Sequence, residues 1–122
     1  MAAGFDEWFD AFALALFRDD GAAVGAFAEP TVLFEAKQTQ VLATHADVAE
    51  HLAADRARLV ERGVTRLEWG SIDVRGWGDD QIEVVVEWEA FGDSGLVATA
   101  ERLYLLRGSL PDVVITAILK PD

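Results

Sequence analysis

The chain has 122 residues, 52% of them hydrophobic and 26% charged, which predicts one domain over residues 1–122 with a full apolar core. Acids outnumber bases 22 to 10, a balance that disfavours nucleic acid and anionic membrane surfaces as partners. Cysteine is absent, and we find neither a signal peptide nor the roughly 20 apolar residues of a membrane-spanning helix, so we expect a cytoplasmic protein without disulfides, thiolate chemistry or a membrane partner.

The first third of the chain predicts two helices. A stripe of large apolar side chains at helical spacing, with acids on the other side, indicates a first helix that covers a large apolar surface. The members of this stripe are Phe5, Trp8, Phe9, Phe12 and Leu16. After a break at residues 18–21, where Asp19 or Asp20 can cap the next helix, residues 22–28 predict a short second helix that ends before Pro30.

The middle of the chain predicts a strand pair and a long helix. Residues 31–35 and 38–43 have the composition of a hairpin. Thr44 and Asp47 have the spacing of a capping box, with Asp in the place of the usual Glu or Gln. The helix that they open runs for about five turns until Gly63 stops it, and we expect its charged residues to lie in solvent.

From Val64 onward the apolar pattern changes to period two, which is typical of strands with one buried face. We expect four long strands, over residues 64–75, 81–91, 96–107 and 113–119. Gly70-Ser71 in the middle of the first strand indicates a bulge, which bends a strand. The order of the elements predicts an α+β fold, in which a curved, mainly antiparallel sheet of about six strands wraps around three helices.

A family resemblance rests on residues 19–35 (DDGAAVGAFAEPTVLFE), residues 44–52 (THADVAEHL) and the four C-terminal strands. In these segments the chain resembles the nuclear transport factor 2-like superfamily, and within it the polyketide-cyclase (SnoaL-like) and ketosteroid-isomerase-like branch. The resemblance covers nearly the whole chain and implies a cystatin-like cone, with a cavity between helices and sheet and no cofactor. Members include isomerases, cyclases, dehydratases, epoxide hydrolases and non-catalytic modules, so the fold alone selects no activity.

Glu35 is the first candidate catalytic residue. The resemblance implies an acid near the end of the first strand, and Glu35 follows Thr-Val-Leu-Phe at that place. Burial in an apolar cavity raises the pKa of a carboxyl toward the range that is useful for proton transfer. Because Glu35 also lies within two residues of a turn, an exposed side chain is the alternative.

The register of the hairpin over residues 81–107 decides between two further catalytic candidates. If residues 92–95 form the loop, Val86 faces Glu101, which then points inward among apolar neighbours, while Tyr104 points outward. A one-residue shift or a bulge turns Glu101 outward and brings Arg102 and Tyr104 inward instead. An inward Tyr104 would be the natural hydrogen-bond donor to a substrate oxygen.

Each face of the predicted sheet has an expected role. We expect the cavity on the inner face to be lined by Phe12, Leu16, Phe34, Val86, Trp88 and Leu103. The outer face mixes charged residues with apolar ones, which are Leu67, Trp69, Val85, Phe91, Ala98 and Ala100. Such a surface is too apolar for solvent alone, so we predict a homodimer that packs sheet against sheet.

The sequence predicts a domain that binds an apolar small molecule, and two functions are compatible with it. One is cofactor-independent acid–base chemistry, of the isomerase, cyclase or hydrolase type, on an apolar carbonyl compound. The alternative is a non-catalytic ligand-binding or dimerisation module. No metal site is expected, because His45 and His51 are six residues apart and do not share a helical face.

Overall fold

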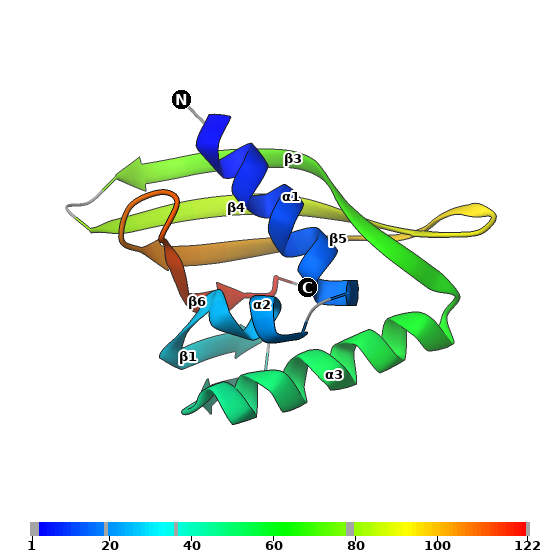
Figure 1. The fold of residues 1–122 in the computed structure, drawn as a ribbon, viewed down its shortest axis with the longest axis horizontal. Helices are drawn as coiled ribbons and strands as arrows, with labels where there is room; N and C mark the ends of the chain where they lie inside the picture. Colours follow the sequence, from blue (N-terminus) through cyan, green and yellow to red (C-terminus); the bar gives the residue numbers. More distant parts are fainter. Residues whose placement is uncertain (1–2, 19, 36, 78–79, 122) are drawn as a thin grey trace.

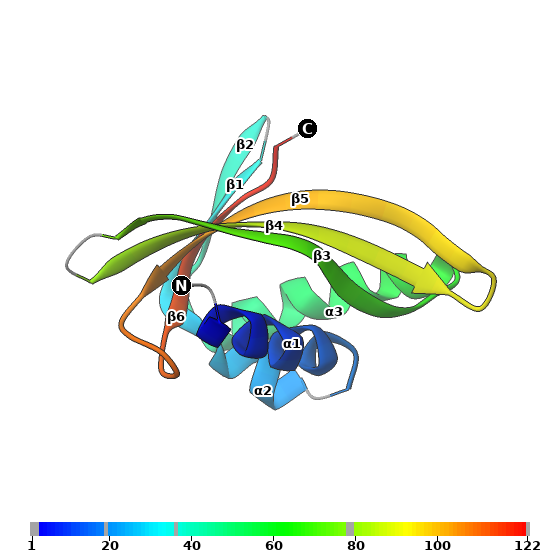
Figure 2. The same cartoon turned by 90° about the horizontal axis from the view of Figure 1, so that it is seen from above.

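The computed structural model describes residues 3–18, 20–35, 37–77 and 80–121, which form three helices and a six-stranded sheet (Figure 1). The strand order is β2-β1-β6-β5-β4-β3. β1 pairs with β6 in parallel, and the other neighbouring strands pair antiparallel. All three helices lie on the same side of the curved sheet (Figure 2). The predicted α+β class is therefore confirmed.

Helix α1 (Ala3–Arg18) follows the predicted aromatic stripe, and Phe5, Phe9 and Phe12 are at most 5% exposed. Helix α2 (Asp20–Gly25) ends earlier than predicted, because strand β1 (Phe27–Glu35) begins where the sequence predicted helix. The sequence Ala26-Phe27-Ala28 fits either structure, and pairing of Phe27 with Ile115 of the neighbouring strand selects the extended form. The predicted capping role of Asp19 or Asp20 falls outside the described side chains.

Helix α3 (His45–Glu61) begins after the predicted N-cap, Thr44, whose side chain accepts a hydrogen bond from the Asp47 backbone N–H at 3.2 Å. The Asp47 carboxylate accepts from the backbone of Ala43 and not from Thr44, so the box is shifted by one residue. The remaining strands are β2 (Gln38–Leu42), β3 (Val64–Trp77), β4 (Gln81–Gly92), β5 (Gly95–Arg107) and β6 (Val114–Leu119). None of the helices in the described ranges is both long and apolar enough to cross a membrane.

A bulge at Gly70 divides β3 into two halves, as predicted. Trp69 pairs with Trp88 on one side of it, and Ser71 pairs with Glu87 on the other. This extra residue inverts the alternation of side chains, so Leu67 and Trp69 face the helices and not the outer surface, which corrects the prediction for both. The predicted three-residue loop at residues 78–80 lies in part outside the described residues.

The register of β4 against β5 corrects the prediction that Glu101 points inward. At the hairpin tip Phe91 pairs with Leu96, as predicted, but a bulge at Val97 shifts the rest of the ladder by one residue. Val86 therefore faces Arg102, and Glu101 lies exposed on the outer face. The bulged register keeps a carboxylate out of the apolar interior, where its charge would be costly. The same shift moves Ala98 and Ala100 from the outer face to the inner face.

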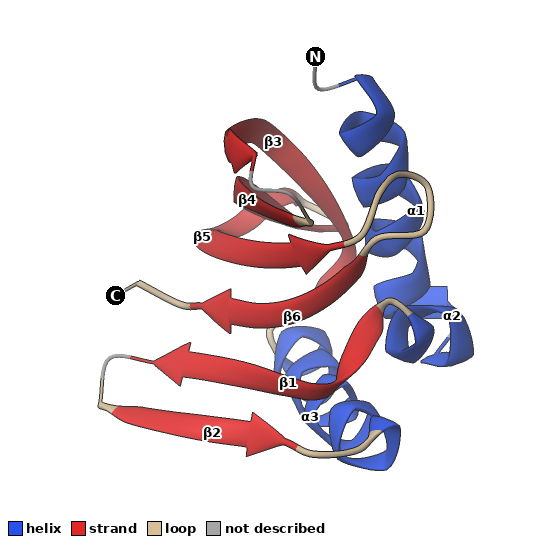
Figure 3. Cartoon of the chain, turned by 90° about the vertical axis from the view of Figure 1, so that its left-hand side faces the viewer, coloured by secondary structure: helices blue, strands red, loops and turns tan. Residues whose placement is uncertain are grey.

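Tyr104 is buried on the inner face, which is the second outcome of this register. Its row across the sheet runs from Leu33 of β1 through Ile118 and Tyr104 to Val84. Figure 3 shows the helices gathered on one side of the strands, with the opposite face of the sheet uncovered by any described element. The molecule thus has one buried concave face under the helices and one bare convex face.

Candidate functional site

A pocket of about 240 Å³ opens between α1, α3 and the concave face of the sheet. Its apolar lining consists of Phe12, Leu16, Phe17, Phe27, Leu52, Leu59, Leu67, Trp88, Ala90, Ala98, Ala100 and Ile118. Its polar lining consists of His51, Asp55, Arg56, Arg62, Thr99, Arg102, Tyr104 and Lys120. The polar groups come from α3 and its C-cap, from β5 and from the residue after β6, so distant segments of the sequence share one space.

The floor of the pocket is an aromatic layer. Trp88 Nε1–H donates a hydrogen bond to the Tyr104 hydroxyl oxygen at 2.8 Å. The rings of Phe9 and Phe12 lie 5.4 and 6.2 Å from the Tyr104 ring, centroid to centroid. Burial raises the pKa of Tyr104 above its usual value, against a smaller opposite effect of the Trp88 hydrogen bond. Tyr104 therefore carries a neutral hydroxyl that accepts from Trp88 and keeps its own proton for donation.

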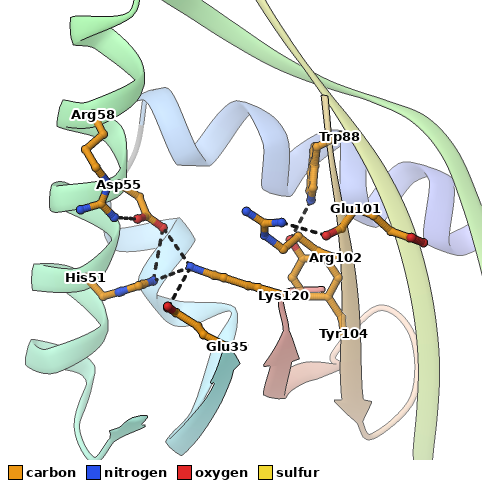
Figure 4. Close-up of polar contacts among 9 residues, drawn as sticks. All are labelled: Glu35, His51, Asp55, Arg58, Trp88, Glu101, Arg102, Tyr104 and Lys120. Carbon is orange, nitrogen blue, oxygen red and sulfur yellow. Dashed lines mark hydrogen bonds and ion pairs between the residues drawn. The ribbon is translucent and has the colours of Figure 1, made fainter. Parts of the chain in front are cut away.

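A cluster of four charged or ionisable side chains, Glu35, His51, Asp55 and Lys120, lies at one edge of the pocket (Figure 4). His51 Nε2 is 3.2 Å from Asp55 Oδ2, one helical turn away on α3. Lys120 Nζ reaches across from the end of β6 and lies 3.5 Å from His51 Nε2, 3.7 Å from Asp55 Oδ2 and 3.8 Å from Glu35 Oε1. We call these four residues the charged cluster.

Asp55 is the acid of the pocket lining, and its surroundings stabilise the ionised form. Burial alone raises the pKa of Asp55, but the His51 hydrogen bond and the charges of Lys120, His51 and Arg58 outweigh it and lower the pKa to about 2. The Asp55 carboxylate is therefore ionised at neutral pH and fixes the orientation of the imidazole. When His51 Nε2 donates to Asp55, Nδ1 of the neutral ring keeps its lone pair and is able to accept a proton.

Arg102 stands on the concave face of β5, two residues before Tyr104 and therefore on the same side of the strand. Its guanidinium donates from Nη1 to the backbone oxygen of Glu101 at 2.8 Å. Among the described residues, no carboxylate lies within the 4.0 Å that defines an ion pair with Arg102. In Figure 4 this side chain projects from β5 toward α3.

The predicted catalytic residues occupy three different places. Tyr104 lies in the pocket floor. Glu35 is at the end of β1, with a side chain 37% exposed, and pairs with Lys120 at the pocket edge. Glu101 points away from the pocket on the convex face, where it lies opposite Glu87. The structure therefore brings Glu35 near Tyr104's pocket but separates Glu101 from both.

The predicted cavity lining is correct in part. Phe12, Leu16 and Trp88 line the pocket. Val86 is fully buried on the same face without lining it. Phe34 and Leu103 lie on the convex face, because both pair with Leu119 in one row on that side of the sheet.

Sequence reasoning missed three polar residues of the site, which are His51, Asp55 and Lys120, and it gave Arg102 as an inward residue only for the shifted register. A signal for the first two exists in α3, where polar side chains occupy the stripe that Val48 and Leu52 begin at helical spacing. Lys120 gives no local signal, since only the fold brings the end of β6 opposite Asp55 of α3. Within the described residues, no three His, Asp or Glu side chains are arranged to hold a metal ion.

Comparison with known proteins gives one family and a set of shared folds. A family model described as NTF2-like protein (DUF6841) matches residues 2–116, and no curated protein matches the sequence. An NTF-2-like protein of unknown function from Shewanella oneidensis MR-1 aligns with a TM-score of 0.71 and 17% identity over 99% of this chain and 98% of that one.

Two further solved structures have the same architecture. A protein of unknown function with a cystatin-like fold from Nostoc punctiforme aligns with a TM-score of 0.73 and 13% identity, over 93% of this chain and 84% of that one. Aln2 from a Streptomyces species aligns with a TM-score of 0.73 and 12% identity, over 96% of this chain and 86% of that one. At these identities the likeness shows a common fold and assigns no activity.

Proposed function

Because the chain belongs to the NTF2-like family DUF6841, as its sequence resemblance predicted, we propose that it binds a small, largely apolar molecule that carries an oxygen function. The observation that carries this proposal is the Tyr104 hydroxyl in the pocket floor. It accepts from Trp88, and among the described residues nothing accepts its proton in return. A ligand oxygen above the floor would complete this pair, because a hydroxyl that accepts one hydrogen bond becomes a better donor.

The size of the pocket restricts the ligand. Its volume of about 240 Å³ lies below the roughly 300–1,000 Å³ of sites for drug-sized molecules. Aromatic and aliphatic side chains form most of the lining, so burial of apolar ligand surface supplies the affinity. We therefore expect one or two fused rings, or a short branched chain, with the oxygen function at one end.

The His51–Asp55 pair favours a second candidate function, which is cofactor-independent acid–base chemistry on an apolar carbonyl compound. A carboxylate that holds an imidazole in one tautomer is the arrangement of a general base with its orienting group. His51 would remove a proton next to the carbonyl, and Tyr104 would stabilise the oxyanion that develops. Glu35, which pairs with Lys120 at the pocket edge, stays a prediction as the base. The non-catalytic module uses the same pocket without this proton transfer.

The binding experiment is a thermal-shift screen of small aromatic ketones, lactones and acids, followed by calorimetry on the compounds that stabilise the protein. Tyr104→Phe should weaken a compound that binds through its oxygen by about fivefold to tenfold. Compounds of the same shape without oxygen should bind both proteins equally. If no small apolar compound raises the melting temperature of the wild-type protein, the proposed function is wrong.

A turnover experiment separates the enzyme from the module. For any bound ketone, exchange of the proton next to the carbonyl with deuterated water reports general-base catalysis directly. His51→Gln should abolish the exchange while binding persists, and Glu35→Gln should leave it within about threefold. Exchange that depends on Glu35 and not on His51 would restore the base predicted from the sequence. An absence of exchange with every bound ketone supports the non-catalytic module.

The convex face supports a homodimer as the molecular partner. Two rows of apolar side chains cross four strands there: Phe34, Leu119, Leu103 and Val85 in one, and Val41, Val32, Ala117 and Leu105 in the other. We call them the outer apolar rows. A second copy of the same surface, related by a two-fold axis, would cover them. The cytoplasmic location and the lack of a nucleic-acid partner stay predictions.

A further inference from the structure

We propose that the ligand of the pocket is an anion, an apolar monocarboxylic acid whose carboxylate binds Arg102 and Tyr104. The inference deepens the proposed function and rests on it. A neutral ketone or lactone satisfies the pocket volume and the Tyr104 hydroxyl equally well. The charges of the pocket lining distinguish neutral carbonyl compounds from carboxylate anions.

The first argument is the imbalance of charge at the pocket. The whole chain has 22 acids and 10 lysines and arginines, for a net charge of −12. The described pocket lining reverses this ratio, with four of those ten bases and one acid. The bases are Arg56, Arg62, Arg102 and Lys120. A concave site with an apolar wall focuses such a local field, so it attracts an anion although the protein as a whole is acidic.

The second argument is that the single acid of the lining is already occupied. Asp55 is surrounded by His51, Lys120 and Arg58, and Lys120 also pairs with Glu35. The two carboxylates, Glu35 and Asp55, face two cations, Lys120 and Arg58, so these groups neutralise one another. The charge of Arg102 is not offset by them, because no carboxylate among the described residues pairs with it.

The third argument is the position of Arg102. Its guanidinium lies on the apolar concave face, and one backbone oxygen is the partner found for it among the described residues. Arginine carries several N–H donors in a planar fork that fits both oxygens of a carboxylate. Tyr104 is two residues further along the same face of β5, so its O–H and the guanidinium point into one region. A carboxylate there would accept from both groups.

The test compares acids with their uncharged primary amides, which have the same shape. Benzoate, cinnamate and 2-naphthoate are titrated by calorimetry at neutral pH, beside benzamide, cinnamamide and 2-naphthamide. For the tightest pair, the acid should bind wild-type protein about tenfold or more tightly than the amide, because a charge-assisted bidentate contact is lost in the amide.

Variants then assign the preference to Arg102. Arg102→Gln should weaken the acid by about tenfold and leave the amide within about twofold. Arg102→Lys keeps the charge without the fork and should retain part of the preference. Arg107→Gln is the matched control, since Arg107 is exposed on the same strand outside the pocket, and it should change neither affinity.

Each outcome decides the inference. Equal binding of acid and amide to the wild-type protein, or a preference for the amide, overturns it while the proposed function stands. A preference for acids that Arg102→Gln and Arg102→Lys both leave intact overturns the role of Arg102. If Arg102→Gln does not fold, the lysine variant and the wild-type preference decide. If neither acids nor amides nor the neutral compounds of the first screen bind, the proposed function itself fails.

Discussion

At the scale of single residues, the hydrogen bond between Trp88 and Tyr104 holds the pocket floor in place. The indole N–H can only donate, and Trp88 is 6% exposed, so solvent does not replace the tyrosine oxygen as its acceptor. A buried donor without a partner costs about 1–3 kcal/mol. The two rings come from neighbouring strands, so the bond also fixes the register that turns Tyr104 inward.

The Trp88–Tyr104 pair predicts a measurable coupling. Tyr104→Phe should lower the free energy of unfolding by about 1–3 kcal/mol, because it leaves the indole N–H unpaired. In Trp88→Phe/Tyr104→Phe the second change should cost about 1 kcal/mol less than it does alone, since the orphaned donor is gone. Urea unfolding of the four proteins gives the coupling energy. Strict additivity would show that the bond contributes nothing.

Asp55 predicts how stability depends on pH. Its pKa is about 2 in the folded protein against an ordinary value of 3.8, so its contribution is present above that ordinary value and is lost as pH falls toward 2. Asp55→Asn should therefore be less stable than wild type at neutral pH, by about 1 kcal/mol after allowance for solvent screening. The stability difference between Asp55→Asn and wild type should shrink as pH falls from 3.8 toward 2.

The control for Asp55→Asn is Asp73→Asn, which removes an ion pair with Arg75 in which both side chains are more than half exposed. Exposed pairs contribute little to stability, so the variant should follow the wild-type curve at every pH. Urea midpoints between neutral pH and pH 3 measure both differences. A constant gap between Asp55→Asn and wild type would mean that this carboxylate is not stabilised by its neighbours.

At the scale of elements, two bulges decide which side chains reach the pocket. The bulge at Gly70 was predictable, because a glycine inside a strand pattern indicates one. The bulge at Val97 was not, since valine is an ordinary strand residue and the hairpin tip kept the predicted pairs. The inversion of Glu101 and Tyr104 follows from that one residue. Register errors of this kind are the weak point of strand prediction, because the side-chain period is two.

Helix α3 shows that the exposure of single residues on a helix is also hard to predict from sequence. Its start and end were predicted from the cap at Thr44 and the glycine at position 63. Asp55 was expected in solvent because charged residues usually are, and His51 was considered only as a metal ligand. In the fold the helix extends over the pocket, and Val48 is buried beneath it. The sequence signal for this site is therefore a polar residue within an otherwise apolar helical stripe. Sequence reasoning gave that signal too little weight.

At Gly92 we expect the hairpin to tolerate no side chain. A Cβ added at Gly92 would overlap the backbone oxygen of Gly63, which follows α3. Gly92→Ala should lower the free energy of unfolding by about 1–3 kcal/mol, because backbone must move to relieve the overlap. Gly25→Ala is the control, since nothing lies within 4 Å of its added Cβ, and it should be neutral or slightly stabilising. Equal effects in urea unfolding would contradict the close contact.

At the scale of the whole molecule, the convex face has two unlike halves. The outer apolar rows run across β1, β6 and β5 to Val41 of β2 and Val85 of β4, whereas acids lie in direct opposition further along β3, β4 and β5. Glu87 pairs with Glu101, and Glu68 pairs with Glu89. Like charges opposite one another are unfavourable, and a second copy placed over them would add to the repulsion. The sheet-to-sheet dimer was predicted on the β3–β5 side, but Leu67, Trp69, Ala98 and Ala100 of that surface face inward. The dimer is therefore proposed on the outer apolar rows alone.

The dimer prediction is tested by one substitution on each side of the molecule. Phe34 is 42% exposed in the outer apolar rows, and Leu14 is 55% exposed on α1. We expect sedimentation of wild type and Leu14→Glu as dimers at micromolar concentration. Phe34→Glu should sediment as a monomer, because a charge within the interface must be desolvated. A monomeric wild type, or a Phe34→Glu dimer, would exclude this interface.

The contrast between an acidic exterior and a basic hollow has a kinetic consequence for any organic acid that enters. Such a molecule is repelled at long range and attracted at short range, so its approach is the difficult step. Raising the ionic strength from about 0.01 to 0.1 M shortens the screening length from about 30 to 10 Å. Added salt should therefore raise the association rate of the acid and change its dissociation rate less. Small inorganic anions meet the same long-range repulsion but have no apolar surface to bury in the pocket. The protein would therefore bind apolar organic acids in preference to them.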